Sequence, residues 1–311
     1  MPLHHTTPLL PSIPLQQRVN KAVWLKMESS QPSASFKMRG MGLAAERAVA
    51  AGATQLVSSS GGNAGYAVAC AGRALSVPVT VVVPTTTDER MRSLIGSTGA
   101  TVEVAGSVWD EAHQHACLIA EASGGALLHP FDHPDIWEGH ASVIHEVHAA
   151  GLEPGCVVVS VGGGGLLTGV LQGMNAVGWT ATRVLAVETA GAASFAAAHA
   201  SGEPVQLESI NSIAVTLGAR RVCSEVLRRA QQHDVTSCVV SDAAAVGACV
   251  QFLDDHRVMV EPSCGAALSA VYDRHPDLMS VSGPVLVIVC GGAGVTRSQL
   301  ETWAAALEVM P

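Results

Sequence analysis

Near the middle of the chain lies Val159-Ser160-Val161-Gly162-Gly163-Gly164-Gly165-Leu166-Leu167-Thr168-Gly169, an apolar strand that runs through four glycines into a helix. Similar Val-rich runs alternate with Ala-rich helical stretches along most of the chain, which is typical of βαβ units and a mostly parallel sheet. Glycines lack a Cβ, so their N–H groups can approach an anion closely, and the positive end of the helix adds to the attraction. The stretch therefore predicts an α/β fold with a phosphate site at this turn.

The same periodicity predicts the other elements. Strands are expected at residues 22–27, 55–58, 79–83, 101–104, 157–161, 184–187, 239–240 and 285–290. Helices are expected at 38–51, 63–75, 87–97, 108–122 and 141–150, with a loop over 129–134. A chain of 311 residues is long for one core, and no flexible linker interrupts it. We expect 1–34 and 141–311 to form a large domain, with a small domain of 35–140 inserted in it.

Composition limits the possible partners. The net charge is −9, and only 14% of the residues are charged, without a basic stripe, so we expect no nucleic-acid partner. The apolar runs are too short to span a membrane, and no secretory signal is evident. The eight cysteines form no CxxC pair, which predicts reduced thiols and a cytoplasmic location. The high apolar content of 48% favours a subunit interface, and we expect a homodimer.

Lysine is rare in this chain and occurs only as Lys21, Lys26 and Lys37. Lys37 lies in Ser33-Ala34-Ser35-Phe36-Lys37-Met38-Arg39-Gly40. An enzyme that holds an aldehyde cofactor needs one positioned amine. A solvated lysine at a helix start is the usual alternative, but the glycine-rich segments favour the cofactor interpretation.

Two further segments complete the pattern. Ser58-Ser59-Ser60-Gly61-Gly62-Asn63-Ala64-Gly65 is a second strand-to-helix turn, which suits a small anion such as an amino-acid carboxylate. Asn63 can also donate to a phenolic oxygen, and ordinary helix capping explains the segment equally well. Cys290 ends an apolar strand directly before Gly291-Gly292, where the open backbone suggests that a flat group lies against the thiol.

The sequence contains partial matches to two other kinds of site. A strict G-x-G-x-x-G dinucleotide motif fails here, although a looser register through Gly163, Gly165 and Gly169 keeps a nicotinamide-dependent oxidoreductase as an alternative. The histidines of His145-Glu146-Val147-His148 are three residues apart, which does not match the H-E-x-x-H spacing of zinc enzymes. A metal site built on them is therefore not expected.

Together these segments resemble the fold type II pyridoxal-phosphate (PLP) enzymes of the tryptophan synthase β superfamily. Within them the chain is most similar to the serine/threonine dehydratases, and the thiol at Cys290 points to L-serine dehydratase. The resemblance rests on residues 23–28, 31–40, 59–65, 136–142, 162–166, 261–267 and 290–292, which occur in the same order. It implies two domains, each a mostly parallel twisted sheet flanked by helices, with the cofactor in the cleft between them.

The resemblance also implies roles for individual residues. Lys37 would hold the cofactor, Phe36 would lie against its ring, and Cys290 would face its pyridine nitrogen. The cofactor phosphate would bind at Gly162, Gly163, Gly164, Gly165 and Leu166, and the ring hydroxyl at Asn63. The substrate carboxylate would bind at Ser60, Gly61, Asn63 and Ala64. A monovalent cation such as K+ would bind at Glu188, Ala192, Leu217 and Ala219.

The implied reaction is α,β-elimination of L-serine, and of L-threonine, giving pyruvate or 2-oxobutyrate and ammonia. Threonine dehydration and β-replacement of the cysteine-synthase kind stay open as alternatives. Gly61 departs from the serine that racemases and many threonine deaminases carry there, so we expect elimination to dominate over racemisation. Ala293-Gly294 replaces the usual polar pair, which leaves the ring-nitrogen contact to Cys290 alone.

Overall fold

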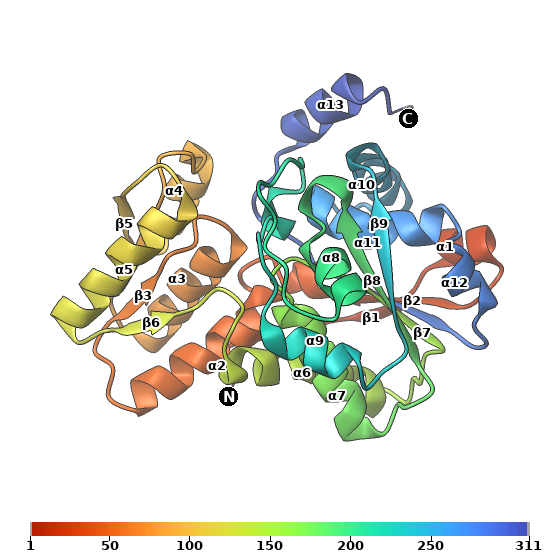
Figure 1. Ribbon diagram of the computed structural model, residues 1–311, viewed down its shortest axis with the longest axis horizontal. Coiled ribbons are helices and arrows are strands. Elements are labelled where there is room, and N and C mark those ends of the chain that lie inside the picture. Colours follow the sequence, from red (N-terminus) through yellow and green to blue (C-terminus); the bar gives the residue numbers. More distant parts are fainter. Residues whose placement is uncertain (1, 310–311) are drawn as a thin grey trace. The chain divides into compact units, whose positions relative to one another are not determined.

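The computed structural model describes residues 2–309, which form two compact units (Figure 1). The smaller unit consists of the chain as far as His5 together with Gln31–His140. The larger unit consists of Thr6–Ser30 and the chain from Ala141 onward. Residues 2–5 and 31–34 thus group with the smaller unit here, whereas the sequence predicts them in the large domain. The domain bounds themselves stay a prediction.

The smaller unit is built on a four-stranded parallel sheet in the order β5-β4-β3-β6. Its strands are β3 (Leu56–Ser58), β4 (Val79–Val83), β5 (Thr101–Val104) and β6 (Ala126–Leu128), and its helices are α2 (Lys37–Ala50), α3 (Asn63–Leu75), α4 (Glu89–Gly96) and α5 (Trp109–Ser123). Each strand is followed by a helix or precedes one, as the alternating sequence pattern predicts.

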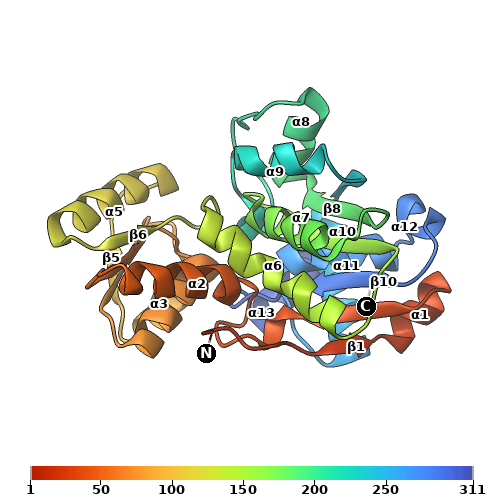
Figure 2. The ribbon, with the colours of Figure 1, turned by 90° about the horizontal axis from the view of Figure 1, so that it is seen from below.

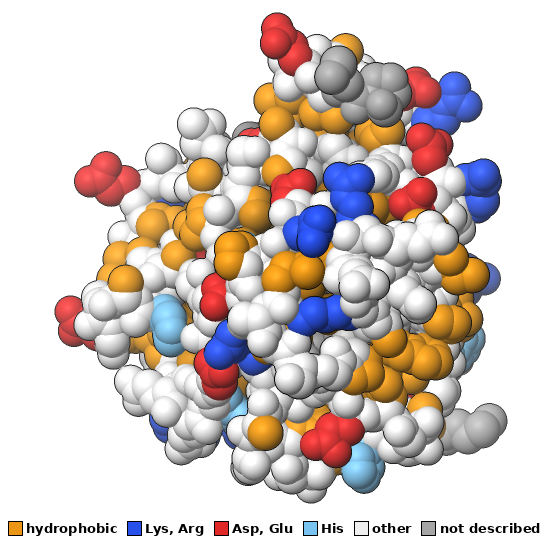
Figure 3. Space-filling model, turned by 90° about the vertical axis from the view of Figure 1, so that its right-hand side faces the viewer, with side chains coloured by type: hydrophobic (Ala, Val, Ile, Leu, Met, Phe, Trp, Pro, Cys, Tyr) orange, Lys and Arg blue, Asp and Glu red, His pale blue; other side chains and the backbone are white. Residues whose placement is uncertain are grey.

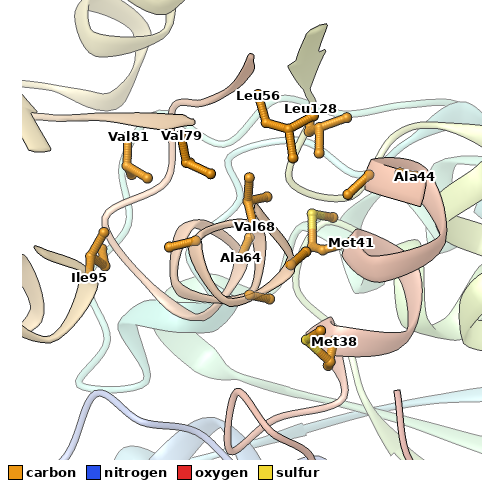
Figure 4. Close-up of a cluster of buried hydrophobic side chains, with 14 of the residues drawn as sticks. Met38, Met41, Ala44, Leu56, Ala64, Val68, Val79, Val81, Ile95 and Leu128 are labelled. Atoms are coloured by element: carbon orange, nitrogen blue, oxygen red, sulfur yellow. The ribbon is translucent and has the colours of Figure 1, made fainter. Parts of the chain in front are cut away.

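The main core of the smaller unit surrounds α3 (Figure 4). Ala64 and Val68 on α3 face side chains from α2 and from the sheet, among them Met41 and Leu56. The small residues on α3 let the helix approach its neighbours closely. At Gly72 a Cβ would lie 2.0 Å from a methyl carbon of Val79, so the helix and β4 approach too closely there for a side chain.

The larger unit contains a six-stranded sheet in the order β1-β2-β10-β7-β8-β9, in which only the β1–β2 pair is antiparallel. Strands β1, β8 and β10 of this sheet are labelled in Figure 2. Its strands are β1 (Leu9–Pro11), β2 (Val23–Met27), β7 (Cys156–Ser160), β8 (Arg183–Thr189), β9 (Val235–Val240) and β10 (Val285–Val289). Its helices are α1 (Ile13–Val19), α7 (Gly165–Val177), α8 (Ser194–Ser201), α9 (Ser224–Ala230), α10 (Asp242–His256), α11 (Pro262–Tyr272), α12 (Pro276–Ser280) and α13 (Arg297–Ala306). Three 3₁₀ turns accompany them: η1 (Glu28–Ser30), η2 (Ala190–Ala192) and η3 (Val215–Leu217).

The centre of the larger sheet is buried on both faces. Every residue of β7 and β10 is buried, which explains why both strands are continuous apolar runs without alternation. Every residue of α11 is buried as well, and this helix packs against β7, β8, β9 and β10. A Cβ at Gly265 would lie 2.1 Å from the carbonyl oxygen of Ala245, so α11 and α10 pack backbone to backbone at this point.

Two of the three lysines have structural contacts in the larger unit. Lys26 is 1% exposed, donates to the carbonyl of Thr7 over 2.7 Å and pairs with Glu146 at 2.5 Å. A buried ammonium needs such partners, because removing it from water is costly. Lys21 donates to the carbonyl of Met279 over 2.6 Å. Neither amine is placed for covalent chemistry.

The structure corrects one sequence expectation in particular. The helix expected at 141–150 is α6 (Pro134–Ala149), which begins seven residues earlier and spans the boundary between the units. Proline opens this helix because the first helical position needs no N–H donor and favours the proline φ angle. The loop expected over 129–134 therefore ends at His133. Strand β9 is also longer than predicted. Several elements lack a predicted counterpart, namely β1, α1, β6, α8, α9, α10, α12 and α13.

The surface carries charges of both signs. On the face drawn in Figure 3, acidic and basic side chains are interspersed and groups of apolar side chains lie exposed among them. Within residues 2–309, no helix is both long enough and apolar enough to cross a membrane.

Candidate active site

Lys37 is the first residue of α2. Ala34, in the segment before it, has a left-handed backbone with φ of 55°, which turns the chain into the helix. The Lys37 amine donates to the carbonyl of Pro130 over 2.6 Å and lies 5.2 Å from the centre of the Phe36 ring. The amine is thus held between two contacts at a fixed point of the smaller unit, as a positioned nucleophile requires.

The second strand-to-helix turn lies between β3 and α3, and α3 begins at Asn63. Asn63 is buried and stands at the start of α3, where the first backbone N–H groups of a helix point outward and can donate to an anion. A Cβ at Gly65 would lie 1.8 Å from the carbonyl oxygen of Ser60, so only glycine allows the turn to close this tightly. The turn combines amide donors with the Asn63 side chain, which suits a carboxylate.

The four-glycine loop joins β7 to α7 in the larger unit. Gly164 caps α7 in a left-handed conformation with φ of 88°, which disfavours a side chain. A Cβ at Gly162 would lie 3.1 Å from the Cα of Leu217, so the loop also lies close to the backbone of η3. The amides of a bare glycine turn at a helix start form an anion cradle.

Cys290 follows β10 and precedes two glycines with positive φ, Gly291 at 81° and Gly292 at 135°. The thiol is 5% exposed. Its hydrogen bond with Cys264, together with burial, raises the pKa of Cys290 well above the ordinary value. The thiol is therefore neutral at pH 7. At Gly292 a Cβ would lie 2.0 Å from the carboxyl carbon of Glu261, so the turn after Cys290 packs directly against that carboxylate.

Glu188 lies near the end of β8 and is completely buried. Its two oxygens accept from the N–H groups of Phe195, over 2.8 Å, and of Ala196, over 2.7 Å. Burial raises the pKa of Glu188 to about 7, although the two hydrogen bonds oppose this rise.

The other residues expected at a cation site lie at or after the ends of 3₁₀ turns. Ala192 ends η2, Leu217 ends η3, and Ala219 comes two residues after Leu217. No cluster of three or more His, Cys, Asp or Glu side chains among residues 2–309 could hold a metal ion.

The sequence did not single out several residues around Lys37. The His140 ring lies 4.9 Å from that of Phe36 and is fully buried, and neither of its nitrogens has a hydrogen-bond partner among the described residues. Burial lowers the pKa of His140 well below its ordinary value, so the ring is neutral. His129 and Pro130 form the turn that meets the Lys37 amine. A lone histidine has no spacing pattern that would reveal such a role.

Comparison with known proteins identifies the family and the fold. A family model for the pyridoxal-phosphate dependent enzymes matches residues 1–291. The human protein "L-serine dehydratase/L-threonine deaminase" is 44% identical over 309 residues, covering 96% of this chain and 94% of the relative. The mouse "Serine dehydratase-like" protein is 45% identical over 308 residues, with the same coverage. The crystal structure of an L-serine ammonia-lyase from the fungus Rhizomucor miehei superposes with a TM-score of 0.93 at 36% identity and covers 100% of both chains.

The predicted fold class is thereby confirmed, since both sheets are mostly parallel and flanked by helices. The nicotinamide alternative is wrong, because the match covers nearly the whole chain and belongs to another cofactor class. This chain belongs to the pyridoxal-phosphate dependent enzymes.

Proposed function

We propose that this protein is an L-serine dehydratase that also acts on L-threonine. It releases pyruvate or 2-oxobutyrate together with ammonia. The observation that carries the proposal is the full-length similarity to relatives that bear this name, together with the single positioned amine of Lys37. The family match alone would leave the reaction open, because PLP enzymes catalyse many reactions.

The residues present fit pyridoxal phosphate. The glycines of the loop have no side chain that would cover its backbone N–H groups, and the start of α7 attracts a dianion. Phe36 is an aromatic face beside the Lys37 amine, and Cys290 is a neutral thiol next to an open glycine turn. These are the donors and surfaces that a phosphate, a flat ring and an aldehyde require.

Each predicted site residue then has a role in binding, and Asn63 contacts both the cofactor and the substrate. Lys37 holds the cofactor, Phe36 lies against its ring, and Asn63 donates to its ring hydroxyl. The backbone from Gly162 to Leu166 binds the phosphate, and Cys290 faces the ring nitrogen. Ser60, Gly61, Asn63 and Ala64 bind the substrate carboxylate.

The chemistry follows from these roles. When bound, the cofactor supplies an electron sink that weakens the Cα–H bond of the amino acid. Lys37 would be released when the amino group of the substrate takes its place on the cofactor, and the free Lys37 amine would then take the Cα proton while the Cβ–O bond of the substrate breaks, so that the elements of water leave. The resulting enamine adds water and yields the keto acid and ammonia. Gly61 offers no hydroxyl, so it cannot return a proton to the opposite face of Cα, and elimination is favoured over racemisation.

Three finer features complete the proposal. Glu188 and the carbonyls of Ala192, Leu217 and Ala219 hold a monovalent cation, K+, for which the buried carboxylate supplies the charge. The protein works as a homodimer. It resides in the cytoplasm, in keeping with eight free cysteines and no disulfide among the described residues.

The test is a direct assay with a label. Purified protein with added pyridoxal phosphate is given L-serine and L-threonine in parallel, and keto acid is measured. Borohydride reduction followed by peptide mapping should place the cofactor on Lys37, and Lys37→Ala should lose both label and product. Lys21→Arg is the matched control. Label at another residue, or cysteine formed from O-acetylserine and sulfide in place of keto acid from L-serine, would overturn the proposal.

A further inference from the structure

A turn of the smaller unit holds the carbonyl group that meets the Lys37 amine. This turn is His129-Pro130-Phe131-Asp132, between β6 and α6. The His129 Nδ1 atom accepts from the N–H of Phe131 over 3.3 Å and from the N–H of Asp132 over 2.8 Å. The indole N–H of Trp137 donates to the carbonyl of Phe131 over 2.9 Å. His129 therefore closes the turn as an internal cap.

The imidazole of His129 is suited to this task. Because Nδ1 accepts two amide bonds, the ring proton lies on Nε2. Burial, with smaller effects of His113, Lys37 and His133, lowers the pKa of His129 to about 4. The acceptor at Nδ1 is thus kept throughout the neutral range.

A line of ring contacts connects His129 to the turn after β3. The His129 ring lies edge-on to the Trp109 ring, with 6.3 Å between centres, and edge-on to the His113 ring at 6.0 Å. The rings of Trp109 and His113 stack at 4.7 Å with 16° between their planes. His113 Nδ1 is hydrogen-bonded to the Ser59 hydroxyl over 2.9 Å. Ser59 is buried and directly precedes Ser60, the first residue of the proposed carboxylate site.

We propose that His129 is a positioning residue for the elimination reaction. It fixes the turn whose Pro130 carbonyl receives the Lys37 amine, and through Trp109 and His113 it ties that turn to Ser59 in the substrate-carboxylate loop. The inference rests on the proposed function. In this proposal the three rings keep the Lys37 amine and the substrate-carboxylate loop at fixed positions relative to each other within the smaller unit. The Pro130 carbonyl orients the amine whenever the amine is free to take a proton, and a small displacement of a base lowers the rate strongly.

The first experiment separates the role of the Nδ1 acceptor of His129 from that of its imidazole ring. His129→Leu removes the Nδ1 acceptor, whereas His129→Asn keeps an oxygen at a similar position, which can accept from the same two amides as in an Asx turn. For His129→Leu we expect kcat with L-serine to fall about tenfold and KM to change little, because the substrate contacts remain. His129→Asn should restore most of kcat. His133→Leu is the matched control, since it removes an acceptor for the N–H of Asp135 and leaves the Pro130 turn intact.

The second readout does not depend on serine turnover. In hydrogen–deuterium exchange, the peptide containing residues 129–134 should exchange faster in His129→Leu than in wild type and His129→Asn. The rate at which added pyridoxal phosphate becomes borohydride-trappable on Lys37 should fall in His129→Leu alone. If wild type makes no keto acid, the proposed function fails, while these two measurements still test the role of His129.

The third experiment tests the connection to Ser59. His113→Phe keeps a ring against Trp109 but loses the bond to Ser59, so the KM for L-serine should rise about threefold, as expected for loss of one hydrogen bond. In the double variant with His129→Leu, the loss in the logarithm of kcat/KM should be smaller than the sum of the losses in the two single variants. The inference is overturned if His129→Leu matches wild type in kcat and exchange, or if His129→Asn is as impaired as His129→Leu. If the effects of His129→Leu and His113→Phe add fully in the double variant, the proposed connection between the two histidines is overturned.

Discussion

A Cβ built on Gly61 would lie 2.4 Å from the hydroxyl oxygen of Thr87. The loop is therefore closed to any side chain at position 61 unless Thr87 moves. Introducing the serine that racemases carry should not by itself create a racemase. We expect Gly61→Ser to be destabilised by about 1–3 kcal/mol, as overpacked sites usually are, and to lose dehydratase activity.

Gly61→Ser with Thr87→Ala should recover most of that stability, because the clashing oxygen and methyl are removed. If the new hydroxyl then acts as a second base, D-serine should form from L-serine. Thermal unfolding and chiral analysis of serine check both points. A fully stable Gly61→Ser single variant would contradict the packing argument.

Gly164 and Gly178 offer a matched pair at the two ends of α7. Both have left-handed backbones, with φ of 88° and 78°, so either alanine variant should lose about 1–2 kcal/mol of stability from strain. At Gly164 the added methyl also meets Val226 at 2.9 Å, whereas nothing lies within 4 Å at Gly178. Only Gly164→Ala should disturb the phosphate loop.

We expect Gly164→Ala to bind pyridoxal phosphate about tenfold more weakly, which corresponds to one charge-assisted hydrogen bond, and Gly178→Ala to bind it as wild type does. Cofactor titration by absorbance measures this. Equal affinities in the two variants would remove the loop from the cofactor site.

Glu188 allows a test of the proposed cation. Protein exchanged into a buffer that contains only a large organic cation should lose activity, and K+ should restore it. Glu188→Gln keeps an oxygen for one of the two amides but removes the charge, so K+ should no longer restore activity. The activity as a function of K+ concentration in both proteins is the measurement. A wild-type activity that is indifferent to the cation would contradict this part of the proposal.

The pKa of His129 predicts a pH dependence of stability. Its pKa is lowered to about 4 in the folded protein, against about 6.5 for the unfolded chain. The unfolded state therefore binds more protons as pH falls below 6.5, and stability is lost progressively down to about pH 4. His129→Asn lacks this titration. Its free energy of unfolding should fall less than that of wild type between pH 7 and pH 4.5, as denaturant titrations at several pH values would show. If the free energies of unfolding of wild type and His129→Asn fall in parallel with pH, the lowered pKa of His129 is contradicted.

Much of the architecture could be predicted because the strands are short and apolar and glycines mark their ends. The predicted bounds of α3, β4 and β5 match the structure to the residue. The start of α6 is predicted too late, because Pro134 and its neighbours suggest a loop although proline fits the first helical position well. The short segments β1 and α1 carry little periodic signal, so tertiary packing determines them.

The candidate site likewise contains residues that the sequence predicts and residues that it does not predict. Lys37, the glycine loop and Cys290 could be predicted because each belongs to a contiguous motif. His113, His129 and His140 could not, since their significance depends on what the fold brings next to them. The roles given to these site residues stay predictions until the variants are made.

The scarcity of lysine has a practical consequence. Lys26 is buried in an ion pair and Lys21 donates to backbone carbonyls of the larger unit, whereas Lys37 is the one lysine that the proposed cofactor would occupy. Mild acylation followed by peptide mapping would then report the occupancy of this one position, because mapping separates Lys37 from the amino-terminal amine. Bound cofactor would protect the position from the reagent, so the peptide map could distinguish loaded from empty enzyme in a crude preparation.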